Sequence, residues 1–163
     1  MIDTSHMTLL PGDGSWPWHA WIDGADIVVV NARATAFGGA NDPQDNGETA
    51  SGLNTKFNPQ FVGCALPMAY AGHHPELIAA LGGSPIPRIP WRSPVVISCA
   101  ASGKQITAKV IDLGPGKRTG NAIDLTVAAA RFFTPAATSS NFSLAVHYRL
   151  PGAAQYIMGG GQA

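Results

Sequence analysis

Short stretches of apolar and alternating residues along this chain predict β-strands rather than long helices. A β-branched run at residues 27–30 begins the first strand, which we expect to continue to residue 37. Residues 142–150 alternate strictly between apolar and polar positions, as in a strand with one buried face. Further strands are expected at residues 61–66, 94–99 and 105–111, the last two joined by a tight turn.

Only two segments have the pattern of a helix. Residues 75–81 begin with Pro75 and are followed by two glycines, and residues 125–133 end before Pro135. Many short strands, few helices and no internal repeat are typical of a small closed barrel, because closure leaves no strand edge exposed. We therefore expect one all-β domain.

The chain is expected to have four segments. Residues 1–7 end in Ser-His-Met and resemble a vector remnant, residues 8–26 form a Trp-rich N-terminal strap, residues 27–152 form the barrel, and residues 153–163 form a flexible Gly-rich tail. The indoles of the strap either pack on the barrel or form an exposed platform for sugar rings. We favour packing, but we keep Trp18 as a candidate for substrate binding.

Composition and charge narrow the classes of ligand. The chain has equal numbers of basic and acidic residues, 10 of each, and therefore lacks the positive charge that nucleic-acid binding needs. No apolar run is long enough to cross a bilayer. Only 12% of the residues are charged, which suits a neutral or weakly charged ligand such as a sugar polymer.

The cysteines and histidines predict no metal site and no cofactor. Cys64 and Cys99 lack a Cys-x-x-Cys spacing, and they form either a disulfide or two buried thiols. The adjacent His73 and His74 point apart in an extended segment and have no obvious third ligand.

Two aspartates have apolar neighbours along the chain. Asp112 closes an apolar strand, and Asp124 lies between Ile123 and Leu125 just before the second expected helix. The glycine-rich loop between them can bring both carboxylates to one mouth of the barrel. Apolar surroundings raise the pKa of a carboxyl, which suits a general acid for glycosidic cleavage. The structural alternatives are a helix N-cap for Asp124 and a turn aspartate for Asp112.

Four short motifs strengthen the case for chemistry at these aspartates. They are Ala-Thr-Ala-Phe-Gly-Gly at 34–39, Thr-Ala-Ser-Gly at 49–52, Ile-Asp-Leu-Gly-Pro at 111–115 and Ala-Ile-Asp-Leu-Thr at 122–126. Together they resemble the double-psi β-barrel superfamily, which includes rare lipoprotein A, the expansins, family 45 endoglucanases and membrane-bound lytic transglycosylase A. The resemblance implies an all-β fold, a six-stranded double-psi β-barrel with one or two short helices.

The resemblance also assigns roles to three residues. Asp124 matches the essential aspartate of the expansins and the acid of the family 45 enzymes and lytic transglycosylases. Asp112 matches the first expansin aspartate, and Thr35 matches their strand threonine. The chain departs from rare lipoprotein A at Leu53, where an acidic residue is usual, and at Cys64, where Ala-His is usual.

The resemblance implies an enzyme that acts on a polysaccharide, either peptidoglycan or a cellulose-like glycan. The leading hypothesis is a lytic transglycosylase with Asp124 as general acid and base, Asp112 tuning it and Thr35 holding the sugar. An inverting family 45-like hydrolase is the first alternative and needs a second carboxylate, from Asp42, Asp45, Glu48 or Asp112. The second alternative is a non-catalytic, expansin-like module that binds or loosens the polymer.

The remaining expectations concern substrate contacts and location. The candidate substrate-binding residues are Phe37, Ser51, Asp45, Glu48, Trp18 and Trp91. We expect a monomer that is secreted, periplasmic or associated with a cell wall, cellular or phage-borne, whose leader is absent from this chain.

Overall fold

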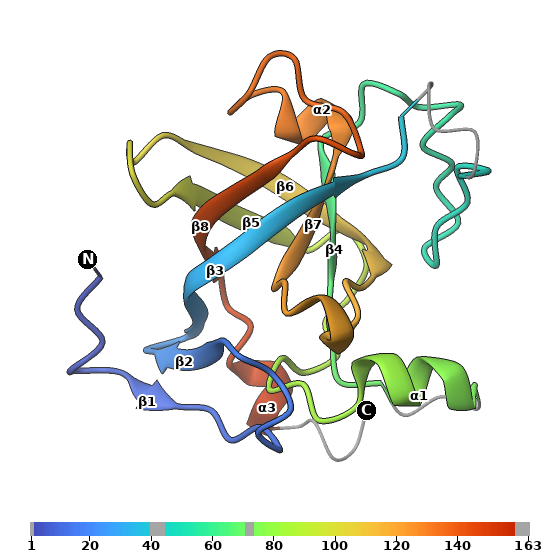
Figure 1. Cartoon of the computed structure of the whole chain (residues 1–163). Helices are drawn as coiled ribbons and strands as arrows, with labels where there is room; N and C mark the ends of the chain where they lie inside the picture. The colour runs from blue at the N-terminus through green and yellow to red at the C-terminus, as the bar shows by residue number, and fades with distance from the viewer. Residues whose placement is uncertain (1, 40–44, 71–73, 159–163) are drawn as a thin grey trace.

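Six strands form a closed barrel in the computed structural model, which describes residues 2–39, 45–70 and 74–158 (Figure 1). The barrel strands are β3 (Asp26–Phe37), β4 (Gly63–Leu66), β5 (Pro94–Cys99), β6 (Gln105–Leu113), β7 (Ile123–Thr126) and β8 (Ser143–Leu150). They pair in the order β3-β7-β4-β6-β5-β8, and β8 pairs back with β3 to close the ring. The β3–β7 and β4–β6 pairs are parallel and the others antiparallel. The all-β barrel expected from the sequence is confirmed, and its mixed pairing is compatible with a double-psi barrel.

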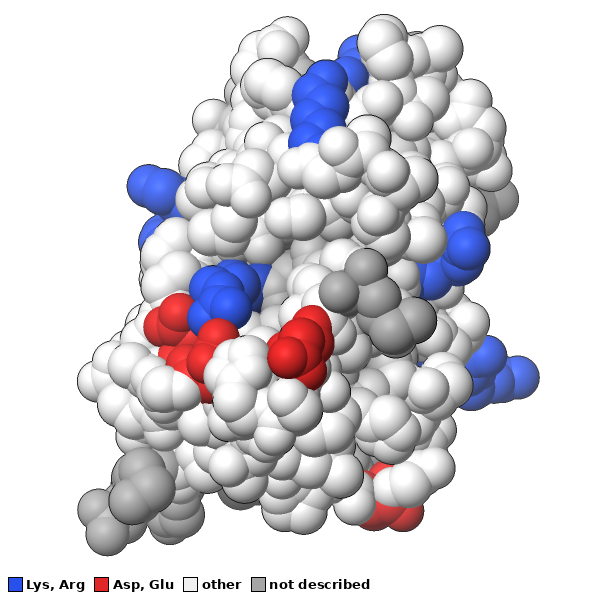
Figure 2. Space-filling view, turned by 90° about the vertical axis from the view of Figure 1, so that its left-hand side faces the viewer, with Lys and Arg blue, Asp and Glu red and all other residues white. Residues whose placement is uncertain are grey.

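Charged side chains are sparse on the outside of the barrel, and Figure 2 shows a face that is mostly uncharged. The ion pairs of Arg149 with Asp23 and Asp26, at 2.8 and 2.9 Å, tie β8 to the start of β3 and to the strand before it. These half-buried pairs near the surface contribute modestly to stability individually, so the fold depends mainly on its core.

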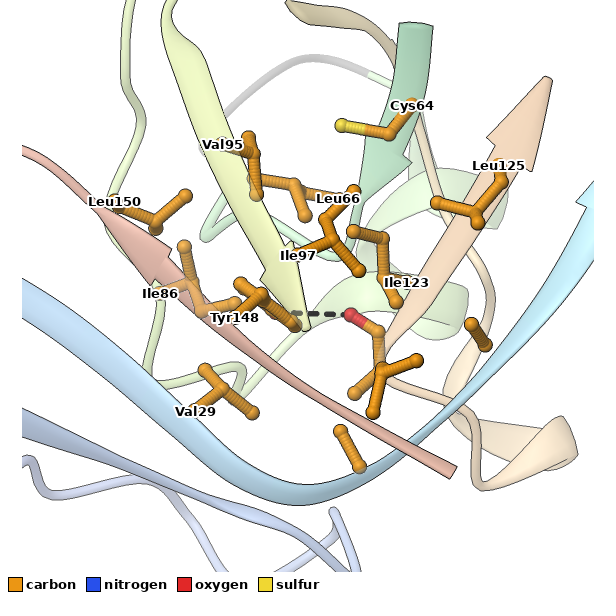
Figure 3. Close-up of a cluster of buried hydrophobic side chains, with 14 of the residues drawn as sticks. Val29, Cys64, Leu66, Ile86, Val95, Ile97, Ile123, Leu125, Tyr148 and Leu150 are labelled. Carbon is orange, nitrogen blue, oxygen red and sulfur yellow. Dashed lines mark hydrogen bonds between the residues drawn. The ribbon is translucent and has the colours of Figure 1, made fainter. Parts of the chain in front are cut away.

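The core fills the inside of the barrel with side chains from all six barrel strands, and Figure 3 shows part of it. Tyr148 is 2% exposed, and its hydroxyl donates a hydrogen bond of 2.9 Å to the carbonyl of Ala122. Burial raises the pKa of Tyr148, so the phenol remains a neutral donor.

The N-terminal strap packs its indoles on the barrel, as favoured from the sequence. Its strands β1 (Thr8–Leu9) and β2 (His19–Asp23) extend the sheet beyond β3. Trp16 and Trp18 are each 5% exposed and donate from their indole nitrogens to the carbonyls of Gly82 and Asn121. Trp18 is therefore largely buried in the strap, and its selection for substrate binding stays a prediction.

The described residues contain three short α-helices and one 3-10 turn. These are α1 (Pro75–Leu81), η1 (Lys117–Thr119), α2 (Val127–Ala130) and α3 (Gln155–Met158). The first was expected with these bounds. The helix expected at 125–133 is shorter, because Leu125 and Thr126 belong to β7. Within the expected Gly-rich tail, Ala153 is buried and α3 packs on the core, whereas residues 159–163 lie outside the described residues.

The cysteines are two separate thiols, so the disulfide alternative is wrong. Cys64 lies in β4 and Cys99 ends β5, and β6 runs between these two strands. Burial raises the pKa of Cys64 well above its ordinary value, as for an inert core thiol.

A bulge in β3 decides which of its side chains face outward. Against β8, the pairing advances by three residues from Val29 to Ala32 while β8 advances by two, which leaves one extra residue on β3. Val29 faces the core before the bulge, whereas Ala32, Ala34 and Ala36 face it afterwards. Without the extra residue, Thr35 would point into the core.

Asn31 carries this bulge with a φ of 55°, a left-handed conformation that Gly and Asn tolerate and β-branched residues do not. Its N–H also donates to His147 Nδ1 at 3.0 Å. We expect Asn31→Val to lower the free energy of unfolding by about 1–3 kcal/mol and Asn31→Gly to change it little. Chemical denaturation of both variants tests this expectation, and equal stability of the two would contradict it.

Candidate functional site

Four residues on adjacent strands form a row across the outer face of the barrel. Thr35 on β3 pairs with Asp124 on β7, and Ala65 on β4 pairs with both Asp124 and Asp112. Residues in register on neighbouring strands point to the same face. The two aspartates are thus separated by one strand, about 10 Å between Cα atoms. The structure therefore brings together the three residues that were expected to carry the chemistry.

A second bulge aligns Asp112 with this row. Between Cys64 and Ala65, β4 advances by one residue while its partner β6 advances by two, from Val110 to Asp112. Ile111 is the extra residue, and it is fully buried. Bulges of this kind redirect side chains near functional sites. Without it, Ala65 would lie opposite Ile111 and the carboxylate of Asp112 would leave the row.

Asp124 lies in the middle of β7 between two core residues and is itself half-buried. Thr35 Oγ1 donates to its Oδ1 at 2.6 Å. Burial is the main factor that raises the pKa of Asp124; the threonine hydrogen bond lowers it, and the negative charge of Asp112 raises it further. The site therefore holds a carboxyl that is protonated more readily than an exposed aspartate.

Asp124 does not cap a helix, so the structural alternative for it is wrong. The N-cap of α2 is Thr126, whose hydroxyl oxygen accepts from the N–H of Ala129 at 3.2 Å. The hydroxyl of Thr126 also donates to the carbonyl of Phe61 and accepts from the N–H of Gly63. Because Thr126 caps α2, helix capping does not explain why position 124 is an aspartate.

Asp112 is held by the loop of the Thr-Ala-Ser-Gly motif. Its Oδ1 accepts from the N–H of Ala50 at 3.0 Å and from that of Leu113 at 2.9 Å, and the N–H of Ser51 donates to the carbonyl of Ile111. Burial raises the pKa of Asp112, these two backbone donors lower it, and the charge of Asp45 raises it. Asp112 is thus a positioned carboxyl that acts on Asp124 through its charge.

Asp45 is a described loop acid whose charge raises the pKa of Asp112. Its Oδ1 accepts from the N–H of Gly47 at 2.7 Å. Its Oδ2 lies near Gly38, which directly follows β3 in the motif at residues 34–39. Glu48 is exposed in the same loop and exerts no such effect. Asp42 lies outside the described residues.

The remaining sequence candidates lie at two edges of this row. Phe37 is half-buried two residues after Thr35 and therefore on the same face of β3. Ser51 follows the residue that binds Asp112, and Trp91 is 39% exposed at the end of the connection before β5. These positions remain candidates for substrate contact.

The sequence analysis missed a cationic group at this edge. The guanidinium of Arg92 lies over the ring of Phe61, 5.4 Å from its centroid, and its Nη1 donates to Ser51 Oγ at 3.3 Å. Arg92 lies in an irregular, proline-rich connection, where no periodicity marks a residue as functional. Its neighbour Trp91 was selected only as an exposed aromatic.

No group of three or more His, Cys, Asp or Glu in the described part of the chain is placed to hold a metal ion. No helix there is long and apolar enough to cross a membrane. His73 lies outside the described residues, and His74 pairs with Glu76 at 3.6 Å. The arrangement is therefore one of carboxyls, hydroxyls and one guanidinium.

No protein-family model matches the chain, and no curated protein is similar to it in sequence. The residues and geometry described above are accordingly the basis for any assignment of function.

Proposed function

We propose that this protein cleaves the glycan strands of peptidoglycan as a lytic transglycosylase of the double-psi β-barrel superfamily, with Asp124 as general acid and base. The single observation that carries the proposal is the state of Asp124: a half-buried carboxyl with raised pKa, in a row with Thr35 and Asp112. Action on a wall polymer places the protein outside the cytoplasm, and one chain contains the whole row, so a monomer suffices.

The reaction needs one carboxyl and no water. Asp124 donates its proton to the oxygen that bridges two sugars, and the bond from C1 of the muramic residue to that oxygen breaks. The C6 hydroxyl of the same residue then bonds to C1 and returns its proton to Asp124, which gives a 1,6-anhydro product. The Asp112 carboxylate raises the pKa of Asp124, so that more of it is protonated before each turnover. Thr35 Oγ1 orients the carboxyl through Oδ1.

Asp45 supports an inverting hydrolase as a second candidate function. Such an enzyme needs a base roughly 6.5–9.5 Å from the acid, with a water between them. Asp45 lies in the loop after β3, and its charge reaches Asp112. In this reaction Asp45 would take a proton from water, and the product would carry a reducing end.

The products distinguish these reactions. The protein is incubated with purified peptidoglycan and, separately, with amorphous cellulose, and the soluble products are identified by mass spectrometry. Anhydromuropeptides support the transglycosylase. Reducing-end fragments that disappear in Asp45→Asn establish the hydrolase instead. No products from either polymer, with protein retained on the insoluble material, leave a binding module and overturn the proposal.

The pH dependence of cleavage gives an independent test. Because Asp124 must be protonated to act, kcat is expected to be constant at acidic pH and to fall about tenfold per pH unit above its raised pKa. Asp112→Asn removes a negative charge that raises this pKa, so the falling limb moves to lower pH. Glu76→Gln, in the exposed α1, is the matched control and is expected to leave the pH above which kcat falls unchanged. If Asp112→Asn leaves unchanged the pH above which kcat falls, the coupling of the two aspartates is contradicted.

A further inference from the structure

The backbone of Arg92 is held beside the carboxylate row. Its N–H donates to the carbonyl of Val110 at 2.8 Å, and the N–H of Val110 donates to the carbonyl of Ser93 at 3.0 Å. Val110 lies two residues before Asp112 on β6. Arg92 has a φ of 72°, a conformation that costs energy in any residue with a Cβ. The two hydrogen bonds to β6 maintain this conformation and direct the side chain toward Ser51.

The guanidinium of Arg92 rests on a support that is itself built into the barrel. It stacks on the ring of Phe61 and donates to Ser51 Oγ. The ring of Phe61 lies over Gly63, where a Cβ would be 3.0 Å from two ring carbons, and the carbonyl of Phe61 accepts from Thr126. Gly63 thus leaves the space that the ring occupies. The position of the guanidinium follows from these contacts rather than from a free side chain in solvent.

No carboxylate among the described residues forms an ion pair with this guanidinium. Arg92 is exposed. It does not contribute to the pKa of Asp112 either, which burial raises. A guanidinium has five N–H donors in a planar fork, and one of them is used by Ser51. Donors suited to a carboxylate or a phosphate therefore remain open at the edge of the site.

We propose that Arg92, supported by Phe61 and Ser51, binds an anionic group, a carboxylate or a phosphate, on the polysaccharide that the site accepts. The substrate is then an acidic glycan rather than a neutral one such as cellulose. Guanidinium binds planar oxyanions through two parallel hydrogen bonds, which gives both affinity and orientation. Trp91, the preceding residue, is 39% exposed and remains a candidate for contact with a sugar. The position of this subsite relative to the chemistry rests on the proposed role of Asp124, whereas the binding itself does not.

Equilibrium binding to insoluble polymer tests the subsite without turnover. All proteins carry Asp124→Asn, and they are titrated against intact peptidoglycan, carboxyl-amidated peptidoglycan, acid-stripped peptidoglycan without phosphate polymers, and cellulose. We expect Arg92→Gln to weaken binding to intact peptidoglycan roughly tenfold, as for loss of a charge-assisted hydrogen bond. Arg92→Lys is expected to be intermediate, because it keeps the charge but lacks the fork. Glutamine also carries a Cβ, so the strain at this position is unchanged.

The polymers identify the anionic group. The quantity compared is the difference in binding between the protein with native Arg92 and the Arg92→Gln variant. If amidation of the polymer removes this difference, the group is a carboxylate. If acid stripping removes it, the group is a phosphate. Lys104→Gln is the matched control for charge, because Lys104 precedes β6 at the end opposite Asp112, about 26 Å away along the strand. Equal weakening on all four polymers, or none on intact peptidoglycan, overturns the proposal. Product release is measured separately, with the protein that has native Asp124. If that protein does not cleave peptidoglycan, the binding result for Arg92 can still be interpreted.

Discussion

Replacing Asp124 by Asn is expected to reduce the release of soluble peptidoglycan fragments by about 10²–10⁴-fold, the usual contribution of a general acid. Asn has nearly the same shape and can still accept the hydrogen bond from Thr35, which is 2.6 Å long in the native protein. The substitution removes the proton that the bridging oxygen needs, and little else. The initial rate of fragment release, followed by mass spectrometry at saturating polymer, measures the effect.

The same substitution is expected not to lower stability at neutral pH. Burial raises the folded-state pKa of Asp124 above its unfolded value, so folding binds the proton more tightly. The protonated carboxyl is stable in the fold, and this stability is lost as pH rises through the window from the unfolded to the folded pKa. Above that window the buried charge is a cost, which Asn removes. The melting temperature of Asp124→Asn at pH 7 should therefore equal or exceed that of the unsubstituted protein.

The combination of these two results separates catalysis from structure. Lost activity with retained stability identifies Asp124 as a catalytic residue, because a structural residue would lose both. Lys104→Gln, far along β6 from the site, should alter neither quantity. Undiminished fragment release by Asp124→Asn would remove the basis of the proposed mechanism.

Replacing Thr126 by Val is expected to lower the free energy of unfolding by about 3 kcal/mol. Among substitutions that exchange one hydroxyl for a methyl group in this protein, we expect this one to have the largest effect on stability. The hydroxyl of Thr126 is buried and serves three partners: the N–H of Ala129, the N–H of Gly63 and the carbonyl of Phe61. Val has nearly the same volume but leaves all three without this partner. Urea denaturation, with the midpoint and slope analysed together, measures the loss.

Thr126→Ser is the control for this effect, because it keeps the hydroxyl and removes only a methyl group. We expect its loss of stability to be well below that of Thr126→Val. Equal losses for the two variants would show that packing of the methyl group, and not the three hydrogen bonds, stabilises this point. Because Thr126 also holds the backbone of Phe61, the valine variant should weaken the support beneath Arg92 as well.

Strand pattern and local stop signals predicted most of the architecture. Five of the strands and α1 were expected near their observed positions, because alternation and the Pro75 and Gly82 boundaries act within a few residues. The strand β7 was not predicted, and residues 125–126 were assigned to a helix, since an apolar residue followed by a polar one fits either element. Pairing of β7 with β3 and β4 decides it in favour of the strand.

The two aspartates were likewise identified from their apolar neighbours and their motifs. Their alignment was not, because it depends on two bulges, at Asn31 in β3 and at Ile111 in β6. Each bulge adds one residue relative to a partner strand far away in the sequence. A period-two pattern along one strand contains no information on the partner's register.

The chain alone predicted a small all-β barrel and two candidate acids and favoured a packed tryptophan strap, since local hydrophobicity, composition and short motifs indicate these features. Strand pairing and packing place Thr35, Asp124 and Asp112 on one outer face, make Thr126 rather than Asp124 the helix cap, and set Arg92 on Phe61, and the sequence showed none of these. The physical reason is that side-chain direction at a barrel surface is set by cross-strand register. Register is fixed by contacts between segments that are distant in the chain.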